Sequence, residues 1–185
     1  MMKLALIFVL CTGALAQVPS LGKCPNLEVV ENFDVEKYMG KWYEAGRYFV
    51  FTELGGKCTT AEYSLNEDGT VNVLNRQVNF LTGKPSSIEG TAELVGESGE
   101  GKLSVTFPSL PGGIKGSLWI LDTDYSSYAV VFSCQDFGIF STKQAWILTR
   151  KRIPSKEVLL KAYAIFDANG FDRTYLIRTN QNNCD

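Results

Sequence analysis

The cysteines are the side chains of this sequence with the widest chemical repertoire, because the chain contains five Cys and no His. Without an imidazole, the sequence excludes a Ser-His-Asp or Cys-His nucleophile, a His-ligated zinc or haem, and a histidine general base. No two cysteines form the Cys-x-x-Cys pair of a redox or zinc site. The sequence therefore points away from most hydrolases and metalloenzymes, and predicts no metal site.

The first sixteen residues have the pattern of a secretory signal peptide. Lys3 supplies a positive charge, residues 4–15 form an apolar run, and a small-x-small cleavage site ends at Ala16. The run is too short for a membrane-spanning helix, which needs about 20 apolar residues. Cleavage would remove Cys11 and leave a mature chain of residues 17–185 that is secreted into the extracellular space.

Cleavage leaves four cysteines, which are Cys24, Cys58, Cys134 and Cys184. In an oxidising compartment an even number of well-separated cysteines favours two disulfides over a reactive free thiol. Four cysteines allow three connectivities, and the spacing alone does not choose among them.

Length and charge limit the fold and the partners. A chain of 185 residues with 45% hydrophobic residues is long enough for one domain with a sizeable core. The formal net charge of −2 gives no basic field that would attract a polyanion, so we expect no nucleic-acid partner.

Short runs rich in β-branched and aromatic residues fill most of the mature chain, separated by Gly, Asp, Pro and Ser. Asp68-Gly69 between two such runs is a hairpin signal. Ser155 and Gly170 flank an amphipathic helix at 156–168, which we expect to pack outside the sheet, and a short last strand is expected at 173–179. This order predicts an all-β antiparallel sandwich or barrel. Its eight main strands are expected at 41–50, 59–66, 70–80, 87–95, 102–108, 115–123, 127–135 and 142–150.

Alternation along these strands separates an inner face from an outer one. The inner face carries aromatic and aliphatic residues together with the amides of Asn75, Gln77 and Gln144. Burying an amide without a partner costs about 1–3 kcal/mol, so these amides favour an interior that meets water or a polar ligand group. An eight-stranded barrel has room for one small molecule inside. A packed sandwich whose amides bond to the backbone is the alternative.

Three segments resemble the conserved blocks of the lipocalin family. They are residues 32–44 (NFDVEKYMGKWYE) with Gly-x-Trp, residues 123–131 beginning Thr-Asp-Tyr, and residues 146–150 (WILTR) with its Arg. Order and spacing agree for all three. Residues 22–26 (GKCPN) and 56–58 (GKC) narrow the resemblance to the apolipoprotein D-like lipocalins, with their arthropod relatives Lazarillo and the insect bilin-binding proteins.

The resemblance implies an eight-stranded up-and-down antiparallel barrel, closed at one end, with one C-terminal helix outside and a short ninth strand. It also implies the disulfides Cys24–Cys134 and Cys58–Cys184. Trp42 would lie at the closed end under the guanidinium of Arg150, a cation–π contact worth about 0.5–2 kcal/mol. The remaining block residues, which would shape that end after a short 3₁₀ turn, are Gly40, Thr123, Asp124 and Tyr125.

The family's ligand contacts match Tyr63, Asn75, Phe107 and Trp146. Leu118 stands where the family has an aromatic pocket residue, and Phe51 lies in the first long loop, over the mouth. The remaining expected ligand contacts rest on alternation or position, with ordinary core packing as the alternative: Ala61, Val73, Gln77, Ile88, Val105, Ile120, Val131 and Ser133.

The resemblance implies a carrier for a small hydrophobic ligand, such as a fatty acid or sterol, and not an enzyme or a resident cofactor. A noncovalently bound biliverdin is the alternative, in a bilin-binding pigment protein. A lipid antioxidant or enzyme is less supported, because Met39 is the one methionine of the mature chain and its cysteines are expected to be paired. A signalling or adhesion scaffold is a further alternative.

The loop 137–140 carries three large apolar side chains, Phe137, Ile139 and Phe140. They are expected either to contact a membrane, a lipoprotein or another copy of the chain, or to fold back over the ligand. Both a monomer and a weak homo-oligomer are compatible with the sequence.

Overall fold

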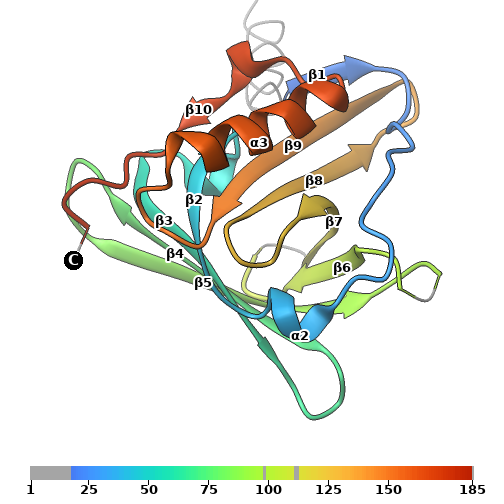
Figure 1. Ribbon diagram of the computed structural model, residues 1–185, viewed down its shortest axis with the longest axis horizontal. Coiled ribbons are helices and arrows are strands. Elements are labelled where there is room, and N and C mark those ends of the chain that lie inside the picture. The colour runs from blue at the N-terminus through green and yellow to red at the C-terminus, as the bar shows by residue number, and fades with distance from the viewer. Residues whose placement is uncertain (1–17, 98, 111–112, 185) are drawn as a thin grey trace, which may run out of the picture.

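The computed structural model describes residues 18–97, 99–110 and 113–184. The expected signal peptide and Cys11 lie outside these residues. Over the described part of the chain, eight consecutive strands each pair antiparallel with the next, and the last also pairs with the first, which closes a barrel (Figure 1). This confirms the predicted fold class. The strands are β2 (Gly40–Arg47), β3 (Gly56–Leu65), β4 (Val71–Asn79), β5 (Pro85–Leu94), β6 (Lys102–Phe107), β7 (Ile114–Thr123), β8 (Tyr128–Asp136) and β9 (Phe140–Thr149).

The β3–β4 connection shows how local sequence sets the register. Gly69 has a φ of +84°, which favours glycine, and the Asn66 N–H donates to the Thr70 carbonyl at 2.8 Å. The Asp68 carboxylate accepts from the Thr70 N–H at 3.0 Å. The predicted hairpin is therefore present, and it pairs Tyr63 with Val73 so that both side chains point into the barrel.

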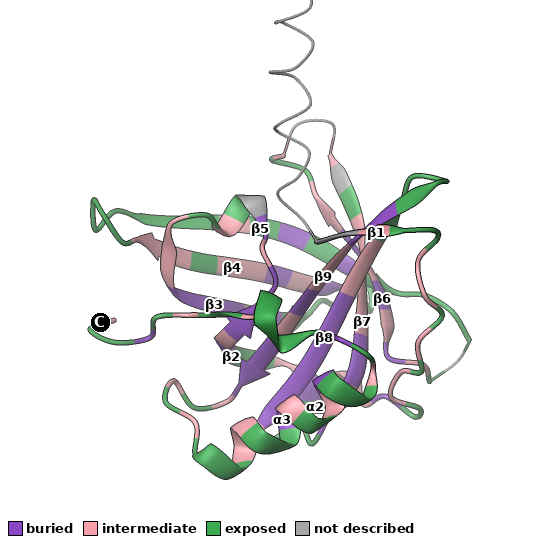
Figure 2. Cartoon of the chain, turned by 90° about the horizontal axis from the view of Figure 1, so that it is seen from above, coloured by how far each residue is buried: buried purple, intermediate pink, exposed green. Residues whose placement is uncertain are grey.

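The predicted helix α3 (Lys156–Ala168) packs on the outer face of the barrel, close to β8 (Figures 1 and 2). The Ser155 hydroxyl caps its start by accepting from the Val158 N–H. Ala162 and Phe166 are its fully buried side chains, and Phe166 belongs to a cluster with Phe132 of β8. The apolar face of α3 is thus buried against the outside of the barrel.

Four short segments differ from the sequence expectation. The first barrel strand ends at Arg47, and the chain then forms a 3₁₀ turn, η2 (Phe51–Glu53). The expected strand at 173–179 is mostly the 3₁₀ turn η3 (Arg173–Tyr175), because the Asp172 carboxylate accepts from the Thr174 N–H, and only β10 (Ile177–Arg178) pairs with β2. An unexpected strand, β1 (Val18–Leu21), pairs with β9. The expected 3₁₀ turn before β2 is one α-helical turn, α2 (Val35–Tyr38).

The two ends of the barrel differ in what covers them. The connections β2–β3, β4–β5, β6–β7 and β8–β9 lie at one end, here called the mouth, because successive strands run in opposite directions. The α2 turn and the other connections lie at the closed end, where Phe33, Tyr38 and Trp42 form an aromatic cluster. No helix of the described residues is long and apolar enough to cross a membrane.

Candidate functional site

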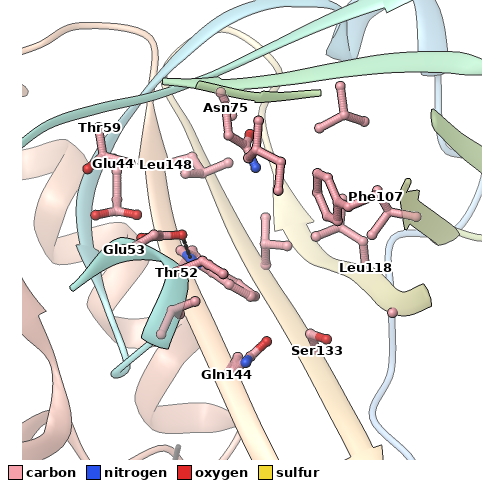
Figure 3. A pocket seen from close by; sticks show the side chains of 18 of the residues that line it. Glu44, Thr52, Glu53, Thr59, Asn75, Phe107, Leu118, Ser133, Gln144 and Leu148 are labelled. Atoms are coloured by element: carbon pink, nitrogen blue, oxygen red, sulfur yellow. Dashed lines mark hydrogen bonds between the residues drawn. The ribbon is translucent and has the colours of Figure 1, made fainter. Parts of the chain in front are cut away.

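A cavity of about 390 Å³ lies inside the barrel, toward the mouth. Its wall is contributed by strands from all sides of the barrel, and the loops β2–β3 and β6–β7 add residues at the rim (Figure 3). Most of the surface exposed in the cavity is apolar, and Asn75, Ser133 and Gln144 bring polar groups from three different strands. The lining residues are Glu44, Val50, Thr52, Glu53, Thr59, Thr60, Ala61, Tyr63, Val73, Asn75, Ile88, Val105, Phe107, Leu110, Gly116, Ser117, Leu118, Val131, Ser133, Gln144, Trp146 and Leu148.

The structure brings most of the expected ligand contacts together in this wall. They are Ala61, Tyr63, Val73, Asn75, Ile88, Val105, Phe107, Leu118, Val131, Ser133 and Trp146. The side chain of Phe51 lies outside the described part of the structure.

Gln77 does not line the cavity, contrary to the expectation from alternation. Its amide N–H donates to the Thr52 carbonyl at 3.1 Å, and its amide oxygen lies over Gly56, where a Cβ atom would collide with it. The β2–β3 loop thus takes the side chain away from the interior. Alternation predicts the face of the strand on which a side chain lies, but at the mouth the direction of the Gln77 side chain is set by its contacts with the packed β2–β3 loop.

Ile120 also does not line the cavity, although it points inward. It lies two residues deeper along β7 than Leu118, in the fully buried cluster that includes Trp42 and Leu103. At that depth the closed end is filled by side chains, so Ile120 packs as core.

Arg150 and Trp42 hold the closed end together. The Arg150 guanidinium carbon lies 3.7 Å from the centre of the Trp42 ring, and Trp42 is fully buried. The guanidinium donates to the carbonyls of Tyr125 (2.9 Å) and Lys41 (3.1 Å), and to those of Lys37 and Tyr38 in α2. This geometry is that of a plug, and neither residue lines the cavity described above.

The turn after β7 completes this end. The Asp124 carboxylate accepts from the backbone N–H groups of Ser126 (3.1 Å), Ser127 (2.7 Å) and Tyr128 (3.1 Å). Burial opposes ionisation of this carboxyl, but these bonds together with the Ser127 hydroxyl hold the pKa of Asp124 below its usual value. Thr123 accepts from the Tyr125 N–H at 2.9 Å. Gly40 has a φ of +90°, and a Cβ atom there would lie 3.4 Å from Arg150 Nη1.

Two disulfides join the chain ends to the barrel. Cys24 pairs with Cys134 on β8, and Cys58 on β3 pairs with Cys184 near the C-terminus. These are the pairs that the family resemblance implies. All four cysteines of the described residues are therefore in disulfides.

Comparison with known proteins identifies the family. Residues 33–181 match the model of the lipocalin-like domain, which covers most of the chain. This chain belongs to the lipocalin family. Apolipoprotein D from Mus musculus is 39% identical over 186 residues, covering 100% of this lipocalin and 96% of the relative. The Lazarillo protein from Schistocerca americana is 38% identical over 140 residues, covering 74% of this chain and 64% of the relative. Among solved structures, insecticyanin from Manduca sexta has a TM-score of 0.79 at 25% identity, with 89% of each chain covered.

The sequence patterns did not predict one feature of this lipocalin barrel, which is a cluster of charged side chains in the cavity wall. Glu44 and Glu53 line the cavity, and Arg47 lies against both. Arg47 bonds to the Glu44 carboxylate and to the Glu53 carbonyl (2.8 Å), and its Nε lies 3.0 Å from the Glu53 carboxyl. Thr179 bonds to both Glu44 and Arg47, and the Trp146 indole N–H donates to Glu53 at 3.3 Å.

This cluster is buried, and it contains two carboxyl groups but one guanidinium. Glu44 is 2% exposed, Arg47 is 6% exposed, and the Glu53 side chain retains 17% exposure. Burial and the adjacent Glu44 carboxyl raise the pKa of Glu53 well above its usual value, against the opposing effect of Arg47. Alternation from Trp42 already places Glu44 on the inner face of β2. Glu53 comes from a loop, where no periodicity reports the direction of a side chain.

Proposed function

We propose that this lipocalin is a secreted carrier that encloses one small hydrophobic ligand in the cavity and carries out no bond-making chemistry on it. The observation that carries the proposal is the cavity of about 390 Å³ inside a barrel plugged at one end. Ligand pockets are typically concave, mostly apolar and about 300–1,000 Å³ in volume, with a few placed polar groups. Tyr63, Phe107 and Trp146 offer flat apolar surface for a lipid chain or a ring system.

The proposal of secretion rests on the leader-like first sixteen residues and on the two disulfides, which persist in oxidising compartments. Expression of the full chain in a secreting host should release a protein whose N-terminus is Gln17. Retention of the full-length chain inside the cell would contradict this proposal.

The test of the carrier function is a titration followed by tryptophan fluorescence. Trp146 lines the cavity, whereas Trp42 is buried in the plug and Trp119 packs with Phe132 on the outer side of the barrel. A sterol or long-chain lipid should quench the emission saturably, with one site per chain. Trp146→Phe is the matched control, because it should abolish the quenching while calorimetry still detects binding. No saturable quenching and no binding heat would refute the carrier function.

A noncovalently bound bilin is the second candidate ligand. The sequence resemblance to insect bilin-binding proteins motivates it, and the aromatic side chains in the wall are suited to stacking against a planar conjugated molecule. The absorbance spectrum of protein purified from its source distinguishes the two. A strong band toward the red would establish the bilin, and a colourless protein would exclude it in favour of a lipid.

The mouth carries a set of exposed apolar side chains, which we propose as a contact surface for a lipid membrane or a lipoprotein. Phe137 and Phe140 stack at 4.9 Å and are 52% and 40% exposed, and Ile139 is 83% exposed. None of the three lines the cavity, which favours an outward contact over the alternative that they cover a ligand. Leu21, Leu54 and Leu81 add exposed apolar surface on neighbouring segments.

Flotation with phosphatidylcholine vesicles tests this surface. The wild-type protein should float with the vesicles, and Ile139→Ser should reduce the bound fraction. Ile153→Ser is the matched control, since Ile153 is an exposed isoleucine outside the mouth connections. Failure of the wild type to float, or a concentration-dependent dimer that Ile139→Ser abolishes, would overturn the membrane assignment.

A further inference from the structure

The cavity wall contains acids but no bases. Glu44 and Glu53 are the charged side chains among the lining residues of the described structure, and no Lys or Arg is among them. Arg47 lies behind the two carboxyl groups and is already engaged by both, by Thr179 and by a backbone carbonyl. A ligand in the cavity therefore meets carboxyl groups, with the guanidinium shielded from it.

The Glu53 carboxyl group lines the cavity and is held in place through both of its oxygens. Its Oε2 lies 3.0 Å from Arg47 Nε but is not aligned for a hydrogen bond, whereas its Oε1 accepts from the Trp146 indole. Because Oε2 has almost no accessible surface, an occupant of the cavity would bond to the exposed part of the Glu53 carboxyl group, whose side chain retains 17% exposure. Figure 3 shows the Glu53 and Glu44 carboxyl groups beside each other in the wall.

From this geometry we propose that the Glu44–Arg47–Glu53 cluster recognises the polar head of the ligand and selects an uncharged hydroxyl or carbonyl head over an ionised carboxylate. The inference rests on the proposed carrier function and narrows its ligand class to neutral lipids, such as alcohols and sterols. The guanidinium is engaged by both carboxyl groups, so no unpaired positive charge faces the cavity, and an anionic head would lie beside Glu44 and Glu53 without a cationic partner.

The surroundings of Glu53 support an uncharged head over a cationic one. The charged and titratable groups that face it are Glu44 and Arg47 from β2 and Tyr63 from β3, while β9 contributes the indole of Trp146. The raised pKa of Glu53 favours a neutral carboxyl, which leaves Glu44 and Arg47 as a balanced pair. An ammonium head would then find no carboxylate that is not already paired with the guanidinium.

The test compares three ligands with the same chain and different heads, namely 1-dodecanol, dodecanoate and dodecylamine. Calorimetry at neutral pH should give the wild-type protein an affinity for dodecanol about tenfold or more above that for dodecanoate or dodecylamine. Acidification should strengthen dodecanoate binding as that ligand becomes neutral and leave dodecanol binding nearly unchanged. This comparison needs no variant, so it does not depend on a substitution that could fail to fold.

Two variants add a second readout. Glu44→Gln combined with Glu53→Gln leaves Arg47 as the single charge of the cluster, and the preference should reverse toward dodecanoate. Glu62→Gln is the matched control, because Glu62 pairs with Arg76 on the outside of the barrel and its loss should not change the preference.

The possible failures are distinguishable. Equal affinities for dodecanol and dodecanoate, or tightest binding of dodecylamine, would overturn the proposed head-group selection and leave the carrier function intact. Absence of binding for all three ligands would overturn the carrier function itself, and the selection with it.

Discussion

Gly116 offers a way to fill the cavity without disturbing the fold. It lines the cavity on β7, opposite Val105 of β6, and shares its inward face with Leu118. A Cβ atom at this position would have no neighbouring atom within 4 Å. Gly116→Leu therefore places a four-carbon side chain into open space, in a strand whose backbone conformation suits a larger residue.

The expected loss of ligand affinity follows from the volume that the leucine side chain takes from the cavity. Four carbon groups take about 120 Å³ at the roughly 30 Å³ of a water-sized group in a liquid. This is close to a third of the cavity volume of about 390 Å³. If the leucine displaces about four ligand methylenes, at about 0.8 kcal/mol each, the binding free energy falls by about 3 kcal/mol. The dissociation constant should then rise about a hundredfold.

Calorimetric titration with 1-dodecanol measures this effect, and thermal unfolding reports on the fold. We expect Tm to stay the same or rise, because a glycine inside a strand costs about 0.5–1 kcal/mol relative to alanine. Lys115→Leu is the matched control, since Lys115 is the exposed neighbour on β7 and its substitution should leave affinity unchanged. A folded Gly116→Leu protein with wild-type affinity would show that the ligand binds elsewhere.

Three further predictions concern the framework around the cavity. Replacing Arg150 with Met removes the stacking on Trp42 and the bonds to four carbonyls. Partial solvent exposure of the guanidinium reduces the contribution of each of these contacts. Urea titration should therefore show a free energy of unfolding that is lower by about 2–4 kcal/mol, and ligand affinity should be unchanged. A loss below about 1 kcal/mol would contradict the plug. Replacing both Cys58 and Cys184 by Ala removes a cross-link between residues 126 positions apart. The double substitution should lower the free energy of unfolding by about 2–5 kcal/mol, and an unchanged Tm would argue against this disulfide. The pKa of Asp124 is lowered in the folded state, so its ionised form stabilises the fold at pH values above its unfolded pKa of about 4. This stabilisation is lost as the pH falls through the folded pKa. Asp124→Ala should therefore cost about 1–2 kcal/mol at about pH 6 and progressively less in acid, and a cost that does not vary with pH would refute this assignment.

Strand alternation predicts much of the cavity wall, because regular strands turn every second side chain inward. Tyr63, Val105 and Trp146 lie in uninterrupted pairing and point as expected. Alternation does not report depth along the barrel, which is why Ile120 belongs to the plug, nor the influence of a packed loop, which is why Gln77 turns away.

Loop residues of the site have no periodic signal in the sequence. Glu53 and Leu110 reach the cavity from the β2–β3 and β6–β7 connections, whose direction depends on contacts made only in the folded barrel. Arg47 fixes the first of these loops through the Glu53 carbonyl and carboxyl groups. Likewise, β1 is only four residues long and depends on pairing with β9, far along the chain.

The central claim is that one apolar ligand lies inside the barrel, against the strands. Nuclear Overhauser contacts between a bound, isotope-labelled dodecanol chain and the side-chain methyl groups of the protein test it most directly. We predict contacts to Val105, Leu118 and Val131 of the cavity wall. Contacts confined to exposed mouth residues such as Leu81 and Ile139, with none to the wall, would contradict the claim.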